Sequence, residues 1–89
     1  MNDLERSALL WLRVFALNPT RKINAEMVEL YGVSRRRSRD IIRYLKNAGA
    51  IILKTSIGYG SKYVLDESVT KRLLHELDNE GRKQKTSGW

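Results

Sequence analysis

Apolar residues in the first stretch of the chain, from Asp3 to Leu17, follow a helical rather than an alternating pattern. Asp3 and Glu5 are favourable near the positive N-terminal end of a helix, and Asn18-Pro19 ends it. The apolar positions cover more than one face, whereas a helix at the surface keeps a narrower stripe. We therefore expect a first helix that either lies deep in the domain or is partly covered by a second copy of the chain.

A second, shorter helix is predicted over residues 25–31, with Asn24 as its N-cap. The polar connection before it, residues 20–23, can contribute a stub of β-strand at Ile23. The residues of this helix that are expected to face inward are Met27, Leu30 and Tyr31.

The longest amphipathic pattern follows the Gly-Val-Ser turn at residues 32–34. Ser34 is a good N-cap and Gly49 a good C-terminal stop, which predicts a helix of about four turns between them. A short helix, a turn opened by glycine and a Ser-capped longer helix form the helix-turn-helix pattern. At about 100° per residue, one face of this longer helix is expected in the core. That face carries Ser38, Ile41, Ile42 and Leu45.

The opposite face of the same helix is basic, and Asp40 is the one acidic residue that interrupts it. Guanidinium forks match phosphates and the N7/O6 edge of guanine, whereas a face that is only solvated usually mixes both signs. Arg37 points to the flank, and the sequence leaves open whether it contacts phosphate or pairs with Glu29. The outward arginines, which predict contact with a nucleic acid, are Arg35, Arg36, Arg39 and Arg43.

The net charge of the chain, +7, is concentrated in its middle third. Residues 34–66 hold eight Lys and Arg against two Asp and Glu, whereas residues 1–33 hold four of each kind and residues 67–89 hold five against four. Such a concentration of one sign is the electrostatic footprint of a protein that binds a polyanion.

Two strand-like runs, residues 50–56 and 62–65, flank a glycine-bearing loop at residues 57–61. Two short strands joined in this way form a β-hairpin. The two glycines of the loop supply the turn, whereas three other residues near the tip either fill the loop or reach the minor groove and the flanking phosphates. We expect contact with the nucleic acid from Tyr59, Ser61 and Lys62.

A last helix is predicted over residues 67–79, capped by Asp66 or Ser68 and stopped by Gly81. Residues 81–89 are then expected to form a basic, flexible tail. The apolar stripe of the helix either packs on the chain's own core or, together with the first helix, forms the surface of a homodimer. This stripe consists of Val69, Leu73, Leu74 and Leu77.

Length and composition predict one domain, residues 1–80, without disulfides, because the chain has no cysteine. The run 8–17 is too short and, with Arg13, too polar to span a bilayer, so we expect a soluble, cytoplasmic and nucleoid-associated protein. His75, the one histidine, is expected at the surface. No nucleophile with a base, metal-ligand spacing, phosphate loop or effector pocket is evident, which argues against an enzyme, a cofactor and a small-molecule effector.

The order of these elements resembles the winged helix-turn-helix family of bacterial and phage-type DNA-binding regulators. Residues 24–36 look like that family's helix-and-turn motif, residues 43–51 look like the exit of its recognition helix into the wing, and the resemblance covers roughly residues 4–65. It implies an α+β fold with a three-helix core, a two-stranded wing and, here, an additional C-terminal helix. The wing has neither the proline nor the tryptophan of the subgroup with a Pro-rich wing.

The resemblance also implies a set of DNA-binding residues. The helix would face the major groove and the loop would form the wing tip. One departure concerns Ser38, where the family usually has a branched apolar residue; either the helix packs less tightly here or Ser38 bonds to the carbonyl of Ser34. The implied DNA-binding residues are Ser34, Arg35, Arg36, Arg37, Arg39, Arg43, Tyr59, Ser61 and Lys62.

The leading hypothesis is a sequence-specific double-stranded DNA-binding protein that acts as a transcriptional repressor. A homodimer, formed through the first or the last helix or both, would read two half-sites about one helical turn apart. The alternative is a winged-helix module of a phage or plasmid replication, excision or packaging complex, in which a protein partner matters more than the operator. RNA is a third option, for which Tyr59 offers only a thin stacking platform.

Overall fold

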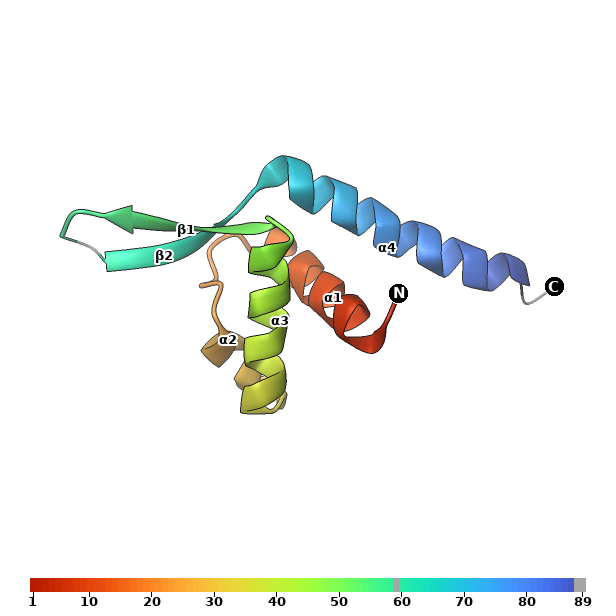
Figure 1. Ribbon diagram of the computed structural model, residues 1–89, viewed down its shortest axis with the longest axis horizontal. Coiled ribbons are helices and arrows are strands. Elements are labelled where there is room, and N and C mark those ends of the chain that lie inside the picture. Colours follow the sequence, from red (N-terminus) through yellow and green to blue (C-terminus); the bar gives the residue numbers. More distant parts are fainter. Residues whose placement is uncertain (59, 88–89) are drawn as a thin grey trace.

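The computed structural model describes the backbone of residues 1–58 and 60–87 and the side chains of residues 1–58 and 60–80. Within these residues the chain forms four helices and one two-stranded antiparallel sheet, so the predicted α+β class is confirmed (Figure 1). The elements in order are α1 (Asp3–Leu17), α2 (Ala25–Glu29), α3 (Arg35–Asn47), β1 (Ile51–Ser56), β2 (Gly60–Leu65) and α4 (Glu67–Ser87).

Helix α1 has the predicted bounds and is capped at both ends by asparagine. The Asn2 side chain accepts a hydrogen bond from the Glu5 N–H at 2.8 Å, and the Asn18 side chain donates to the Val14 carbonyl at 2.8 Å. One face is fully buried, and Leu17 on the outward side is 74% exposed. The helix therefore has apolar residues on two faces, as its sequence predicted. The buried residues are Ala8, Leu9, Leu12 and Phe15.

The prediction for α2 is correct at its start and wrong at its end. Asn24 caps it, accepting from the Met27 N–H at 2.8 Å. The helix ends at Glu29, and Leu30 and Tyr31 follow it, 77% and 56% exposed, so neither faces inward as predicted. Leu30 keeps helical dihedral angles as the C-cap, so its exposure reflects the side of α2 on which it lies. The fully buried residue of α2 is instead Val28. Ile23 lies outside the two-stranded sheet that the described residues form.

Both predicted ends of α3 are confirmed. The Ser34 hydroxyl accepts from the Arg37 N–H at 3.2 Å. At the other end the Gly49 N–H donates to the Lys46 carbonyl and the Ala50 N–H donates to the Leu45 carbonyl, which is the Schellman closure. This closure needs a left-handed residue, and Gly49 has φ +82°. The predicted core face of α3 is buried at all four positions, Ser38, Ile41, Ile42 and Leu45.

The hairpin leaves the core at its base and projects away from the helices (Figure 1). Ile51 is 1% exposed and pairs with Leu65, and the Asp66 N–H donates to the Ala50 carbonyl at 2.8 Å. Strand β1 agrees with the prediction to within one residue, whereas β2 begins two residues earlier than predicted, at Gly60. Every residue of β1 after Ile51 is exposed.

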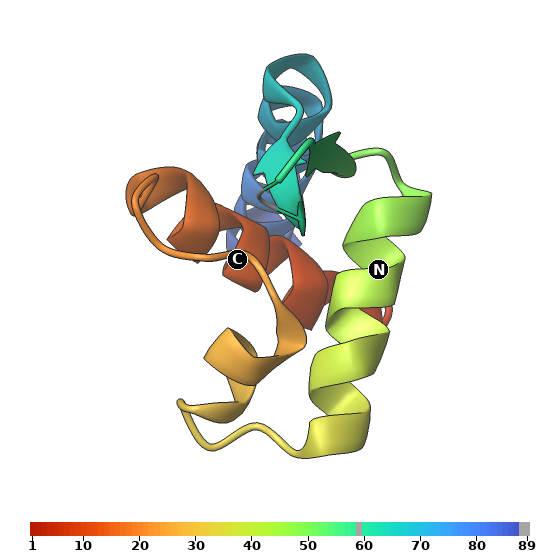
Figure 2. The same cartoon turned by 90° about the vertical axis from the view of Figure 1, so that its left-hand side faces the viewer.

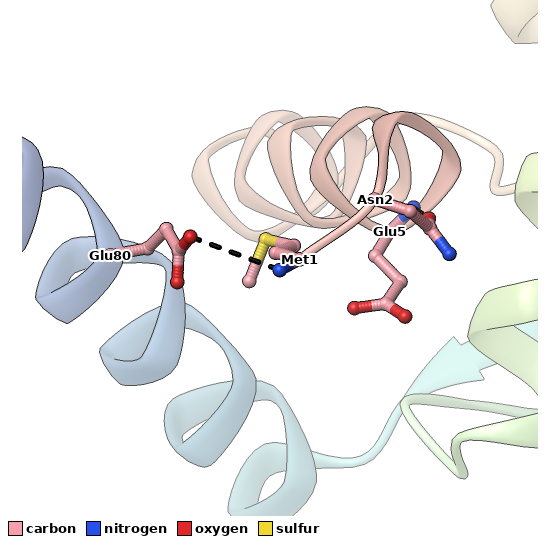
Figure 3. A network of polar contacts seen from close by, with 4 residues as sticks. All are labelled: Met1, Asn2, Glu5 and Glu80. Atoms are coloured by element: carbon pink, nitrogen blue, oxygen red, sulfur yellow. Dashed lines mark hydrogen bonds and ion pairs between the residues drawn. The ribbon is translucent and has the colours of Figure 1, made fainter.

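Helix α4 packs on α1, and its contacts with the N-terminal part of the chain extend to Glu80. Asp66, not Ser68, is the cap, accepting from the Val69 N–H at 2.9 Å. Leu73 and Leu77 are buried in the common core, and Glu80 lies 3.8 Å from the amino group of Met1 (Figure 3).

The predicted stop at Gly81 is wrong, because α4 continues to Ser87. A glycine inside a helix costs about 1 kcal/mol relative to alanine, but it keeps its N–H and has no side chain to clash, so it weakens a helix without ending it. The predicted tail over residues 81–89 is therefore largely helical backbone. No helix of the part of the chain that the structure describes is both long enough and apolar enough to cross a membrane.

Candidate nucleic-acid interface

Helix α3 has one covered face and one uncovered face. Figure 2 shows α1 and α2 on the same side of α3, which leaves its other side free. The covered side supplies Ile41 and Leu45 to the core, 1% and 0% exposed. The four predicted arginines, Arg35, Arg36, Arg39 and Arg43, are all exposed, and two of them, Arg35 and Arg39, border α2.

None of these four arginines makes an ion pair with a residue that the structure describes. The ion pairs of that part of the chain join Met1 to Glu80, Arg13 to Asp78, and Lys71 to Glu67, and none of them involves α3. Glu26 and Glu29 of α2 line a shallow hollow together with Arg35 and Arg39, but at distances beyond an ion pair. The charge of α3 is therefore available to an external anion.

Arg37 is directed away from this group. It is half-buried, and its Nη2 donates to the Ser7 hydroxyl of α1 at 3.3 Å. The sequence left open a phosphate contact or a pair with Glu29, and in the structure Arg37 does not pair with Glu29. Its position joins the N-terminal end of α3 to α1.

Two serines make hydrogen bonds near the N-terminal end of α3. The hydroxyl of Ser34 is exposed but engaged as the N-cap. Ser38 is fully buried, and its hydroxyl lies 3.5 Å from the carbonyl of Val33, at the limit of a hydrogen bond. Of the two alternatives, the bond to the Ser34 carbonyl is not formed, because the side chain turns back to Val33.

The hairpin places two of its three predicted contact residues on the surface. Ser61 and Lys62 are exposed, and the Ser61 hydroxyl is hydrogen-bonded to that of Thr55 at 2.9 Å. Tyr59 lies outside the described residues. The strand register puts Lys62 directly opposite Lys54, so the hairpin carries a pair of lysines where the prediction counted one.

Sequence reasoning missed three further residues of this surface. Lys54 is exposed on β1, and its relation to Lys62 follows from the register rather than from the composition. Ile57, at the turn, is 101% exposed. Lys22 lines a groove between the connection 19–24 and β2, of which Lys62 is also part. The predicted loop, residues 57–61, is longer than the observed one, so it gives a register in which the two lysines do not face each other.

The remaining candidate chemistry of the described residues is sparse. His75 is exposed, as predicted, and no three His, Cys, Asp or Glu side chains there gather to hold a metal ion. Among the titratable groups of these residues, Tyr44 of α3 has the pKa that its environment shifts most clearly. Burial, and then the carboxylates of Glu5 and Glu76, raise the pKa of the Tyr44 phenol above its ordinary value of 10.0.

Comparison with known proteins gives no relative. The chain matches no model of a protein family, no curated protein and no solved structure. The features that bear on its function are therefore the two exposed basic elements, α3 and the β1–β2 hairpin.

Proposed function

We propose that the chain is a winged helix-turn-helix protein that binds a specific double-stranded DNA sequence and represses transcription by occupying it. The observation that carries this proposal is the group of four exposed arginines on α3, which make no ion pair within the described residues. In the proposed complex, Arg35, Arg36, Arg39 and Arg43 lie in the major groove and combine phosphate contacts with readout of base edges.

The rigidity of α3 favours base readout over simple attraction to phosphate. Hydrogen bonds cap the helix at both ends, and Leu45 on its inner face is fully buried. A guanidinium must keep a fixed position to donate two hydrogen bonds to one guanine, whereas a phosphate clamp tolerates movement. A basic face on a firmly held helix is the arrangement that specific readout requires.

The order of elements supports the winged helix-turn-helix assignment. Helix α2, the turn at residues 30–34 and α3 correspond to the helix-turn-helix, and the hairpin that follows corresponds to the wing. The turn contains Gly32 with φ +88°, and a second left-handed glycine, Gly49, joins α3 to the hairpin.

The homodimer is proposed through α1. Leu73 and Leu77 of α4 are buried in the chain's own core. The centre of the apolar stripe of α4 is therefore not accessible to a second copy of the chain. Leu10 and Leu17 of α1, seven residues apart and therefore on one helical face, are 47% and 74% exposed. Two such faces, related by a two-fold axis, would bury each other and link two DNA-binding units.

Selection from a pool of random duplex DNA at about physiological salt, followed by sequencing, tests the proposal because non-specific attraction is screened there. We expect an enriched palindrome with half-sites about one helical turn apart. Arg39→Ala should weaken binding to that site by about 1–3 kcal/mol and relax the preference at one base pair. Arg72→Ala, which removes an exposed arginine from α4, is the matched control and should leave the motif unchanged.

An unenriched pool, with affinity that falls smoothly as salt rises, would contradict sequence-specific repression. The arginines would then act as a phosphate clamp, and the assembly module with a protein partner would take the place of the regulator.

A further inference from the structure

The most exposed large apolar side chain described in the molecule is Ile57, at 101% of its reference area. It lies at the turn between β1 and β2, at the end of a hairpin that projects from the helices (Figure 1). No contact in the described fold requires an isoleucine there, and a turn normally favours polar residues or glycine. Ile57 is therefore placed to contact something outside the chain.

The residues behind Ile57 indicate what that partner is. Lys54 and Lys62 are direct cross-strand neighbours, and neither makes an ion pair with a described residue. Like charges in this position destabilise a hairpin unless an anion lies between or beside them. The tip thus combines one apolar side chain with two exposed lysines whose mutual repulsion a bound anion would relieve.

The hairpin is held together close to its tip. The hydroxyls of Thr55 and Ser61, one residue pair beyond the lysines, are 2.9 Å apart and hydrogen-bonded. Gly58 and Gly60 supply the left-handed conformations of the turn, with φ +84° and +73°. The strands therefore stay paired up to Ser56 and Gly60, next to the turn that carries Ile57.

We propose that Ile57 is an apolar wedge that enters the minor groove and partly unstacks one base-pair step, with Lys54 and Lys62 on the phosphates beside it, so that the protein bends its DNA. The inference rests on the proposed function, because it requires a bound duplex. An apolar side chain inserted between base pairs kinks the duplex toward the major groove, and the kink is easiest at flexible steps such as TA. The wedge therefore adds a preference for a deformable step beside the sequence that α3 reads.

The test uses a duplex of about 30 base pairs that carries the selected site, with a donor and an acceptor dye at its two ends. In a second duplex, 2-aminopurine replaces an adenine at the step that the hairpin covers. We expect the full-length protein to bring the dyes closer and to increase the 2-aminopurine fluorescence, because both signals report a kinked, unstacked step. Ile57→Ser should remove both signals and weaken binding roughly tenfold or less, whereas Ile57→Leu should keep them.

Ile52→Ser is the matched control, since it removes an exposed apolar residue from the body of β1, 44% exposed, and not from the tip. It should leave the bend in place. Circular dichroism of Ile57→Ser should match the unsubstituted protein, because the side chain has no contact to lose.

Three results would overturn the wedge. If the unsubstituted protein binds the duplex and leaves it straight, the wedge fails while the proposed function stands. If Ile57→Ser bends the duplex as well as the unsubstituted protein does, another element causes the bend. If vesicles containing an anionic phospholipid bind the protein through Ile57, and Ile57→Ser leaves the binding and bending of the duplex unchanged, the tip contacts a lipid surface. Failure to bind any duplex would remove the proposed function itself.

Discussion

Helix α3 and the β1–β2 hairpin carry the same sign of charge but are held in very different ways. Along α3, every turn of the inner face is buried, whereas the hairpin is anchored by Ile51 at its base and is exposed along the rest of β1. A side chain on α3 therefore keeps its position relative to the core, and one near the hairpin tip moves with the whole arm. The comparison separates a rigid element suited to base readout from an arm suited to phosphates and DNA shape.

The largest difference is expected when one leucine is truncated in each region. Leu45→Ala removes a side chain with 0% exposure from the inner face of α3 and should lower the free energy of unfolding by about 2–5 kcal/mol. Leu53→Ala removes one that is 47% exposed on β1 and should cost less than about 1 kcal/mol. Urea unfolding followed by circular dichroism measures both. Equal losses would mean that the hairpin is as much a part of the core as α3.

The next difference concerns binding. Arg43→Gln should weaken binding to the selected site by about 1–3 kcal/mol and alter the preference at one base pair. Lys62→Gln should weaken all duplexes alike and lower the slope of log affinity against log salt by about one. Fluorescence anisotropy with the selected and a scrambled duplex, at several salt concentrations, distinguishes the two. A sequence-dependent loss from Lys62→Gln would contradict the division of roles.

The sequence was most informative where one local signal determines one local structure. Asn24 and Ser34 cap their helices because their side-chain oxygens meet a free N–H three residues on, and Gly49 ends α3 because only glycine adopts its conformation easily. The outward arginines of α3 followed from helical periodicity alone. These features depend on neighbours within one turn of helix.

The features that the sequence did not predict depend on partners far along the chain. Arg37 turns toward Ser7, thirty residues away, and no periodicity encodes that contact. Leu30 was expected inside, but it lies on a side of α2 that no other element covers and is 77% exposed. The opposition of Lys54 and Lys62 required the strand register, which a two-residue error at the start of β2 obscured.

A smaller difference is expected between two glycines with the same backbone conformation. Gly49 and Gly58 have φ +82° and +84°. A Cβ added at Gly49 would lie 3.9 Å from the side chain of Val69, and one added at Gly58 would meet no atom within 4 Å. Alanine therefore costs about 1–2 kcal/mol at either site through the backbone alone. Gly49→Ala should express this cost fully, because Gly49 closes α3 and leads into the buried base of β1.

At Gly58 the exposed turn can rearrange and relieve part of the strain, so Gly58→Ala should lower the melting temperature less. For a domain of this size, each kcal/mol corresponds to about 4–8 °C. Differential scanning calorimetry of the two variants measures the difference. A larger loss at Gly58 would show that the turn is held more tightly than the end of α3.

The smallest effect is expected at high pH and concerns Tyr44 on α3. Burial, and then Glu5 and Glu76, raise its pKa in the folded protein above the ordinary value of 10.0. The phenol therefore ionises first in the unfolded chain, so its contribution to stability is complete below about pH 10 and is lost as the pH rises through the folded pKa. Tyr44→Phe should flatten the fall in the free energy of unfolding between about pH 9 and pH 11. Tyr63→Phe on β2 controls for removal of a phenol from the hairpin, and an equal flattening there would show that the loss at high pH does not arise at α3.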